Sequence, residues 1–204
     1  MIALFVNYKS LSDEQLMERV RGPQKARLNG VSAVRRKDDE QAFAELYRRY
    51  ARLLQGFFFR RLGGNEEQAS DHMQDTFLKV WSSRWQYSDG QPFRTWLFTI
   101  AYNLCKNTYR LYQHEQAYLD SLPTDEPIAE DSTPLKLDAA TFDNALQQEL
   151  SRLNEAQQML FELRFTQELT VPEIAAIIGI PEGTVKSRLN TLTNYLRLKL
   201  KDYE

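Results

Sequence analysis

The chain has little of what several functional classes require. Its 204 residues include one cysteine, two histidines, 8 glycines and 7 prolines. The single cysteine, Cys105, cannot form an internal disulfide and favours a reducing compartment. So few thiols and imidazoles provide no ligand set of the zinc type. We therefore expect neither a metal nor another cofactor.

Membrane and exported classes are also disfavoured. No apolar run approaches the roughly 18–20 residues that a membrane span requires. The apolar N-terminus, residues 1–6, has no basic segment before it and no small-residue cleavage site after it, so it does not resemble a signal peptide. We expect a soluble, cytoplasmic protein with no membrane insertion of its own.

An enzyme is a weak interpretation of the sequence. There is no glycine-rich loop that could cradle a phosphate. Cys105 falls on the inward stripe of a predicted helix, and nothing in the sequence brings His72 or His114 beside it. We therefore assign no catalytic residue.

The charge is close to balanced, and its distribution is uneven. The net charge is −2, and residues 121–144 carry six acidic side chains against one basic. A protein that holds nucleic acid by itself usually has a strongly basic domain. Any interpretation as a DNA-binding protein has to explain why the chain lacks this excess of basic charge.

Helical periodicity is what the sequence has in abundance. Apolar residues between Phe43 and Phe58 follow the spacing of an amphipathic helix. Gly63 and Gly64 are predicted to end this helix, and Asn65 to cap the next, which covers residues 69–81. Neither β-type alternation nor an internal repeat is evident.

A third long helix is predicted from Phe93 to Gln113, after a loop over residues 83–92. We expect Trp96 to lie in the core, where truncation to alanine would cost about 3–5 kcal/mol. Three helices with short connections predict a compact helical domain.

The composition of the chain changes at about residue 123, before its second half. Residues 123–141 are rich in acids and proline and predict a flexible linker. Helical signals resume at Phe142, and Asn154 with Gln157 predicts a further helix start. The fold class is therefore all-α, with two small helical domains joined by an acidic linker. The predicted segments are 1–37 (N-terminal helix and basic insertion), 38–122, 123–141 and 142–204.

The most specific local pattern is a helix-turn-helix between Thr170 and Leu189. Thr170 and Glu173 predict a capping box, Pro172 suits a first helical turn, and Gly179 suits a left-handed turn. The residues expected to face inward are Ile174, Ala175 and Ile178 in the first helix and Val185, Leu189, Leu192 and Leu196 in the second.

The second helix of such a motif enters the major groove of DNA with its N-terminal residues leading. Its predicted outward residues are of types that contact bases and phosphates, with Glu182 preceding them. They are Thr184, Lys186, Ser187, Arg188, Asn190 and Thr191. At this point a helical hairpin that only packs remains an alternative.

Four blocks taken together resemble the extracytoplasmic-function (ECF) sigma factors of the bacterial sigma-70 family. The blocks are Glu40–Tyr50, Ala69–Trp81, Phe93–Leu104 and Gly183–Leu189. The resemblance covers nearly the whole chain from Leu11. It implies a dissociable subunit of RNA polymerase that directs promoter-specific initiation by recognising the −10 and −35 elements, without catalysis of its own.

The resemblance also implies partners and site residues. Region 2, residues 38–122, would dock on the β′ clamp helices of core polymerase through Asp71, Gln74, Asp75, Leu78 and Lys79. It would also read and help melt the −10 element through Arg84, Trp85, Tyr102, Asn103, Lys106, Asn107 and Arg110. Region 4, residues 142–204, would bind the −35 element and the β flap. An anti-sigma factor is a further implied partner.

Binding as a subunit also explains the balanced charge, because the polymerase supplies part of the affinity for DNA and tethering raises the effective concentration of two weak sites. A solvated helix face remains the alternative for the docking residues. A tether that contacts nothing remains the alternative for the linker, which the resemblance places in the basic channels of the polymerase.

The sequence departs from the family pattern at three places. Gly22–Lys37 is a basic insertion, interpretable as a loop, a nucleic-acid contact or an element that binds a regulator. Asn107 stands where aspartate is common, which affects the predicted promoter readout. Few arginines follow the recognition helix, so we expect a weaker and less salt-dependent −35 interaction. A free-standing helix-turn-helix regulator is the main alternative, and it would need a dimer interface and a more basic surface.

Overall fold

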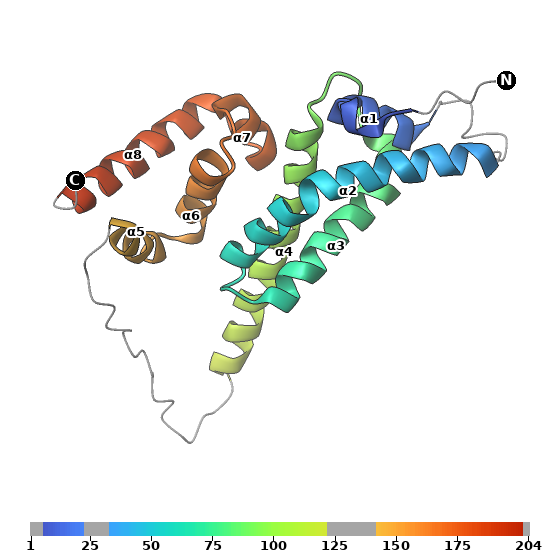
Figure 1. The fold of residues 1–204 in the computed structure, drawn as a ribbon. Coiled ribbons are helices and arrows are strands. Elements are labelled where there is room, and N and C mark those ends of the chain that lie inside the picture. The colour runs from blue at the N-terminus through green and yellow to red at the C-terminus, as the bar shows by residue number, and fades with distance from the viewer. Residues whose placement is uncertain (1–5, 23–32, 122–141, 202–204) are drawn as a thin grey trace. The chain divides into compact units, whose positions relative to one another are not determined.

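The structure is a computed structural model that describes residues 6–22, 33–121 and 142–201 (Figure 1). The described residues form helices and contain no strand. The α-helices are α1 (Asp13–Arg21), α2 (Ala33–Arg61), α3 (Glu66–Ser82), α4 (Phe93–Ser121), α5 (Phe142–Ser151), α6 (Glu155–Phe161), α7 (Val171–Ile178) and α8 (Glu182–Leu200). Two short 3-10 helices, η1 (Tyr8–Ser10) and η3 (Arg84–Gln86), and one π-helical turn, η4 (Glu162–Thr166), complete the set. The all-α prediction is confirmed.

The chain divides into two compact units, Met1–Thr108 and Tyr109–Glu204. The boundary falls inside α4, which continues to Ser121 and is therefore longer than predicted. Helix α2 begins at Ala33, so the end of the predicted insertion is helical, whereas residues 23–32 lie outside the described part. The predicted linker, 123–141, also lies outside it.

Phenylalanine rings dominate the core of the first unit. Phe57 and Phe58 of α2 and Phe98 of α4 are fully buried. Phe57 and Phe98 meet edge to face with ring centroids 5.5 Å apart. Helix α2 ends at Arg61, and the predicted glycines, Gly63 and Gly64, follow it with positive φ. Asn65 accepts the hydrogen bond from the Gln68 N–H that begins α3. Local capping and apolar burial thus place α3 beside α2 (Figure 1).

The expectation that Trp96 belongs to the core is wrong. Its side chain is half-buried and lies beside the rings of Tyr87 and Phe93, at centroid distances of 5.2 and 6.3 Å. The next two residues, Leu97 and Phe98, are the fully buried ones in this turn. Periodicity identifies the side of a helix that faces inward, but it does not give the depth of each residue on that side.

Helix α1 is fixed to α2 by apolar contacts and a polar cluster. Leu16, Met17 and Val20 of α1 are buried, and the Asp13 carboxylate accepts hydrogen bonds from the guanidinium of Arg49, at 2.7 Å, and the hydroxyl of Tyr50. The buried carboxylate of Glu45 accepts hydrogen bonds from Arg48 and Arg49 at 2.7–2.9 Å. These paired charges hold the two helices in a fixed arrangement.

Glu45 gives the first unit a defined pH dependence. Hydrogen bonds from Arg48, opposed by burial and supported by Arg49, lower the pKa of Glu45 to about 2 from an ordinary value of 4.5. The ion pairs therefore stabilise the fold fully above about pH 4.5, and their contribution is lost as the pH falls towards 2. We expect Glu45→Gln to reduce the free energy of unfolding by about 1–3 kcal/mol at pH 7.

Urea unfolding at several pH values tests this expectation. The difference between wild type and Glu45→Gln should be constant above about pH 5 and shrink between pH 4.5 and 2. The exposed Glu40 lies on the same helix, and Glu40→Gln provides the matched control. A difference that does not change with pH would show that the charge of Glu45 is not what stabilises this contact.

The second unit is built around α8. Helices α5, α6 and α7 each pack against it. One apolar cluster joins Leu153, which follows α5, to Leu192, Leu196 and Leu200 of α8. The Glu149 carboxylate of α5 accepts hydrogen bonds from Arg152 and from the Tyr195 hydroxyl of α8. Asn154 and Gln157 form the predicted capping box at the start of α6.

Candidate functional site

The helix-turn-helix of the second unit begins and turns as predicted. The Glu173 carboxylate accepts hydrogen bonds from the backbone N–H of Thr170, at 2.8 Å, and from its hydroxyl, at 2.6 Å. Pro172 lies in the first turn of α7. Gly179 ends α7 in the left-handed conformation, with a φ of 77°, and its N–H donates to the carbonyl of Ala175. A residue with a Cβ is strained in this conformation, so the sequence itself fixes the turn.

The inward faces of the two helices agree with the prediction except at one position. Ile174 and Ala175 are buried, but the third buried residue of α7 is Ile177, whereas Ile178 is only half-buried. Helix α7 packs against η4 as well as α8, so its buried face is turned towards Ile177. The predicted inward residues of α8 are all buried: Val185, Leu189, Leu192 and Leu196.

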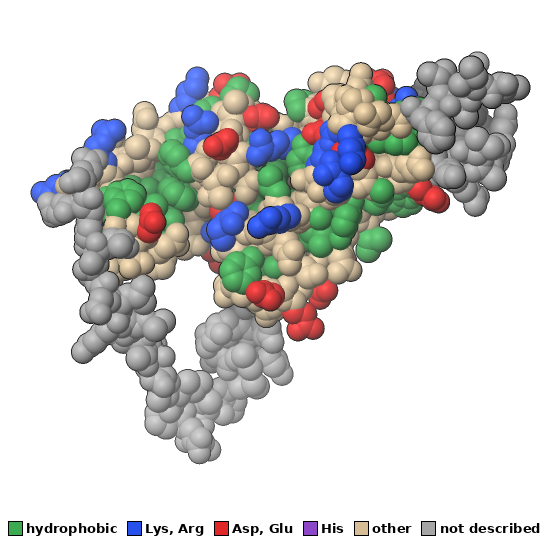
Figure 2. Space-filling model, in the orientation of Figure 1, with side chains coloured by type: hydrophobic (Ala, Val, Ile, Leu, Met, Phe, Trp, Pro, Cys, Tyr) green, Lys and Arg blue, Asp and Glu red, His purple; other side chains and the backbone are tan. Residues whose placement is uncertain are grey.

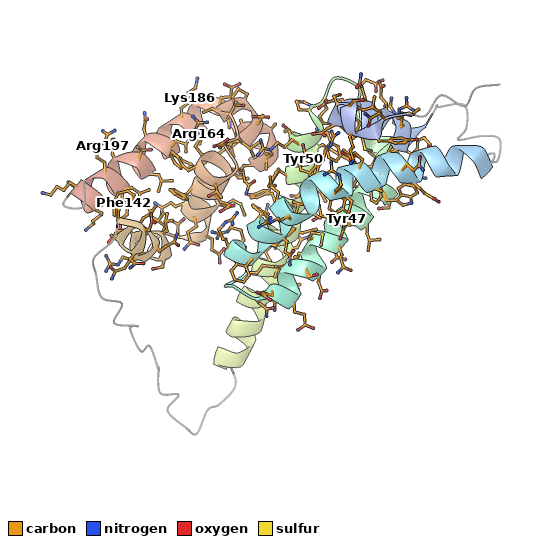
Figure 3. The ribbon with its side chains drawn as sticks, viewed as in Figure 1. Tyr47, Tyr50, Phe142, Arg164, Lys186 and Arg197 are labelled. Carbon is orange, nitrogen blue, oxygen red and sulfur yellow. The ribbon has the colours of Figure 1, made fainter. Side chains whose placement is uncertain are left out.

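The first half of α8 presents polar side chains outward. Lys186, Ser187, Arg188, Asn190 and Thr191 are exposed, and Thr184 is half-buried. The Thr191 hydroxyl donates to the carbonyl of Ser187, which leaves its lone pairs available as acceptors. Figure 3 shows Lys186 near the end of α8 that follows α7 and Arg197 farther along the helix. Lys and Arg side chains follow α8 in Figure 2.

In the first unit, the predicted aromatic and basic pair lies in the segment between α3 and α4. Arg84 donates to the carbonyl of Trp81 at 2.6 Å. Its guanidinium lies 4.5 Å from the ring centre of Trp81 and 5.0 Å from that of Trp85. The Trp85 side chain is half-buried. Stacking on two indoles holds the guanidinium plane and both rings in one orientation.

The other predicted residues of this group share one face of α4. Asn103, Lys106, Asn107 and Arg110 are exposed, and Tyr102 is half-buried. Their spacing of three and four residues places amide and basic side chains next to each other along the helix. The structure thus divides this predicted site between two elements, η3 and α4.

Helix α3 carries the third predicted group, and all five of its members are exposed. They are Asp71, Gln74, Asp75, Leu78 and Lys79. Leu78 is 65% exposed, which is unusual for a leucine on a packed helix. Carboxylates next to an exposed apolar side chain suit contact with another protein.

Sequence reasoning missed the contribution of α2 to this surface. Tyr47 is 40% exposed, and its ring lies 4.7 Å from that of Phe77 in α3. The half-buried Phe43 contacts the rings of Phe77 and Trp81. Hydrophobic side chains gather over α2 and α3 in Figure 2. The signal was present, because Phe43 and Tyr47 lie four residues apart on the predicted apolar stripe, but periodicity alone does not show which residues of that stripe stay exposed.

The described residues hold neither a metal-binding cluster nor a membrane-spanning helix. Among residues 6–22, 33–121 and 142–201, no group of three or more His, Cys, Asp or Glu side chains is arranged to hold a metal ion. No helix in these ranges is both long enough and apolar enough to cross a membrane. Cys105 is buried on the inward side of α4, as predicted.

Comparisons with known proteins agree with this arrangement. Residues 46–114 match the family model of sigma-70 region 2, and residues 143–190 match that of sigma-70 region 4. The ECF RNA polymerase sigma factor RpoE of Cereibacter sphaeroides is 34% identical over 171 residues, which are 82% of this chain and 91% of that protein. SigW of Bacillus subtilis, also an ECF sigma factor, is 30% identical over 180 residues, 82% of this chain and 93% of the relative.

A solved structure is also similar. The sigma factor RpoE of Bartonella quintana, in complex with the anti-sigma factor NepR, aligns with a TM-score of 0.59 and 26% sequence identity. The alignment covers 78% of this chain and 96% of that one.

Proposed function

Because the chain belongs to the ECF sigma factors of the sigma-70 family, which direct core RNA polymerase to promoters, we propose that its three exposed groups divide this work. The α8 group, defined as the six predicted outward residues of that helix, reads the −35 element. The η3–α4 group reads the −10 element and helps to open it. The α3 group docks on the β′ clamp helices of core polymerase, and region 4 contacts the β flap.

The observation that carries this proposal is the arrangement of α8. Its apolar residues are buried in the helix-turn-helix, while Lys186, Ser187 and Arg188 leave the first turns of the helix outward. These are the turns that lead into a major groove in this motif. An arginine placed there can donate two parallel hydrogen bonds to a guanine edge, and a lysine can neutralise a phosphate.

The η3–α4 group suits a different kind of DNA contact. Opening a duplex requires bases to leave the stack, which costs a few kcal/mol per base and is offset by aromatic stacking and polar contacts. Trp85 and Tyr102 offer such rings, and Asn103 and Lys106 offer amide and basic groups. A near-neutral chain is expected to make only weak contacts with DNA. Such contacts suffice here, because the polymerase joins several of them in one complex.

The proposal extends to regulation and location. Promoter recognition needs no chemical step, so the chain acts as a specificity subunit without catalysis of its own. RNA polymerase and its templates are cytoplasmic, and so is the proposed site of action. A relative of this chain has been solved with an anti-sigma factor bound, and we propose that an anti-sigma factor regulates this chain too.

Run-off transcription with reconstituted holoenzyme tests the proposed role of α8. Genomic fragments first identify promoters whose transcripts depend on the chain. On such a promoter, we expect Lys186→Ala combined with Arg188→Ala to weaken promoter binding by about 1–3 kcal/mol if Arg188 makes a bidentate base contact. Arg197→Ala is the matched control, because Arg197 is exposed farther along the same helix (Figure 3).

A comparison of two templates separates a loss of −35 recognition from a general loss of promoter binding. The loss should disappear on a template in which the −35 element is replaced and transcription relies on the −10 element. An equal loss on both templates would contradict base reading by α8. Unchanged activity on the full promoter would contradict the assignment of Lys186 and Arg188 altogether.

A further inference from the structure

Helix α1 contacts the segment of residues 84–93, which runs from η3 to the first residue of α4 and is called the η3–α4 segment below. Arg21, the last residue of α1, donates one hydrogen bond to the Tyr87 carbonyl at 3.0 Å and pairs with the Asp89 carboxylate at 2.5 Å. Glu14, near the start of α1, accepts a hydrogen bond from the Phe93 N–H at 3.2 Å. These three contacts span 66, 68 and 79 residues of sequence.

The spacing of the two α1 residues matches the length of the segment that they hold. Glu14 and Arg21 are seven residues apart, which places them on one face of the helix about 10 Å apart along its axis. Phe93 is the first residue of α4, where backbone N–H groups have no partner within the helix. The Glu14 carboxylate thus caps α4 from another helix. Its negative charge also interacts favourably with the positive N-terminal end of the α4 dipole.

The ionisation of Glu14 is consistent with this cap. Partial burial opposes the charged form, but hydrogen bonds from the backbone N–H groups of Glu14 and Phe93 outweigh it and lower the pKa of the carboxyl. The carboxylate is therefore ionised at neutral pH, when it accepts the hydrogen bond from α4.

Contacts within the η3–α4 segment hold its residues in one fixed arrangement. Tyr87 is buried against Phe93 and Trp96, and its hydroxyl donates to the Gln91 carbonyl. Burial raises the pKa of Tyr87 to about 12, so the hydroxyl stays protonated and able to donate. At the other end of the segment, a Cβ built on Gly22 would lie 4.0 Å from the Trp85 ring, so the end of α1 lies against that ring.

We propose that Arg21 and Glu14 are positioning residues for promoter opening, because they fix the η3–α4 segment in its binding geometry before DNA arrives. This inference rests on the proposed −10 role of Trp85 and Arg84 and deepens it. Helix α1 can act as a rigid support, since its apolar side is buried and Asp13 joins it to α2. A segment that is already ordered loses less conformational freedom when it binds, so more of the stacking energy goes into opening the duplex.

The test uses holoenzyme assembled from core polymerase and the full chain, on a promoter found by run-off transcription. A 2-aminopurine base in the −10 element reports opening by its fluorescence. A short single-stranded oligonucleotide of the non-template −10 sequence reports binding without opening. We expect Arg21→Ala and Glu14→Ala each to lower both the opening equilibrium and oligonucleotide affinity about tenfold, the effect of one charged hydrogen bond.

Three controls separate positioning from loss of fold. Glu18→Ala changes an exposed carboxylate on the same helix and should behave as wild type. Affinities for core polymerase and for a −35 duplex should be unchanged in all α1 variants. Arg21→Lys keeps the charge and one donor to Tyr87 or Asp89, and it should recover part of the loss.

A double-mutant cycle distinguishes failure of this inference from failure of the −10 assignment. If Trp85→Ala alone has no effect on oligonucleotide binding, the −10 role itself is wrong, and the inference fails with it. If Trp85→Ala weakens binding, Arg21→Ala should have little further effect in that background, because it acts through the segment that carries Trp85. Additive effects, or an unchanged Arg21→Ala variant, would overturn the positioning role alone.

Discussion

Replacing both Asp71 and Asp75 with lysine is expected to weaken binding to core RNA polymerase at least about 100-fold, because like-charge contacts across an interface cost several kcal/mol. Both carboxylates are exposed on α3, one helical turn apart and close in sequence to Leu78. The fold should survive, since neither side chain is buried. Binding to fluorescently labelled core polymerase, with circular dichroism as a check of the fold, measures both quantities.

A matched charge reversal controls for general repulsion. Glu18 on α1 is also an exposed acid of the first unit. Glu18→Lys makes the same change in net charge as Asp71→Lys alone, but away from the proposed docking face, and it should bind core polymerase as wild type does. If Glu18→Lys and Asp71→Lys bind equally well, docking does not involve this face of α3.

The second large effect concerns stability. Phe98 is fully buried and packs on Phe57, so we expect Phe98→Ala to lower the free energy of unfolding by about 3–5 kcal/mol. Trp96 is half-buried, and Trp96→Ala should cost less, about 1–2 kcal/mol, because only part of its surface leaves water on folding. Leu78, on α3 of the same unit, is 65% exposed, and Leu78→Ala should stay within about 0.5 kcal/mol of wild type.

Urea unfolding followed by tryptophan fluorescence measures these differences in the intact chain. The three tryptophans, Trp81, Trp85 and Trp96, all lie in the first unit, so their emission reports on that unit. Equal losses for Phe98→Ala and Trp96→Ala would contradict the burial difference in the structure. A large loss for Leu78→Ala would contradict the exposure of this side chain on α3.

Local patterns were predictable because the groups involved lie within a few residues of each other. The predicted caps and the left-handed turn are all present, because each depends on residues close in sequence. They are the Asn65 cap, the Asn154–Gln157 capping box and the turn between Thr170 and Gly179. The outward residues of α8 follow from the same periodicity. The family resemblance, which rests on four such blocks, is confirmed.

Contacts between distant segments could not be predicted in this way. Nothing near Arg21 or Glu14 in the sequence points to Asp89 or Phe93, because these partners meet only when α1 packs on the folded unit. The error at Ile178 has a related origin, since the second neighbour of α7, η4, decides which side is buried. Most of the predicted site residues are exposed, whereas Arg84, Trp85, Tyr102 and Thr184 are half-buried.

The burial of Cys105 makes the molecule convenient for distance measurements by fluorescence. It is the one thiol of the whole chain, and it is enclosed on the inward side of α4. Maleimide dyes react with accessible thiolates, so the native protein should remain largely unlabelled. Two cysteines introduced at exposed positions, one in each unit, would therefore carry a donor and an acceptor. Energy transfer between the dyes would then follow the separation of the two units as polymerase, promoter or inhibitor is added.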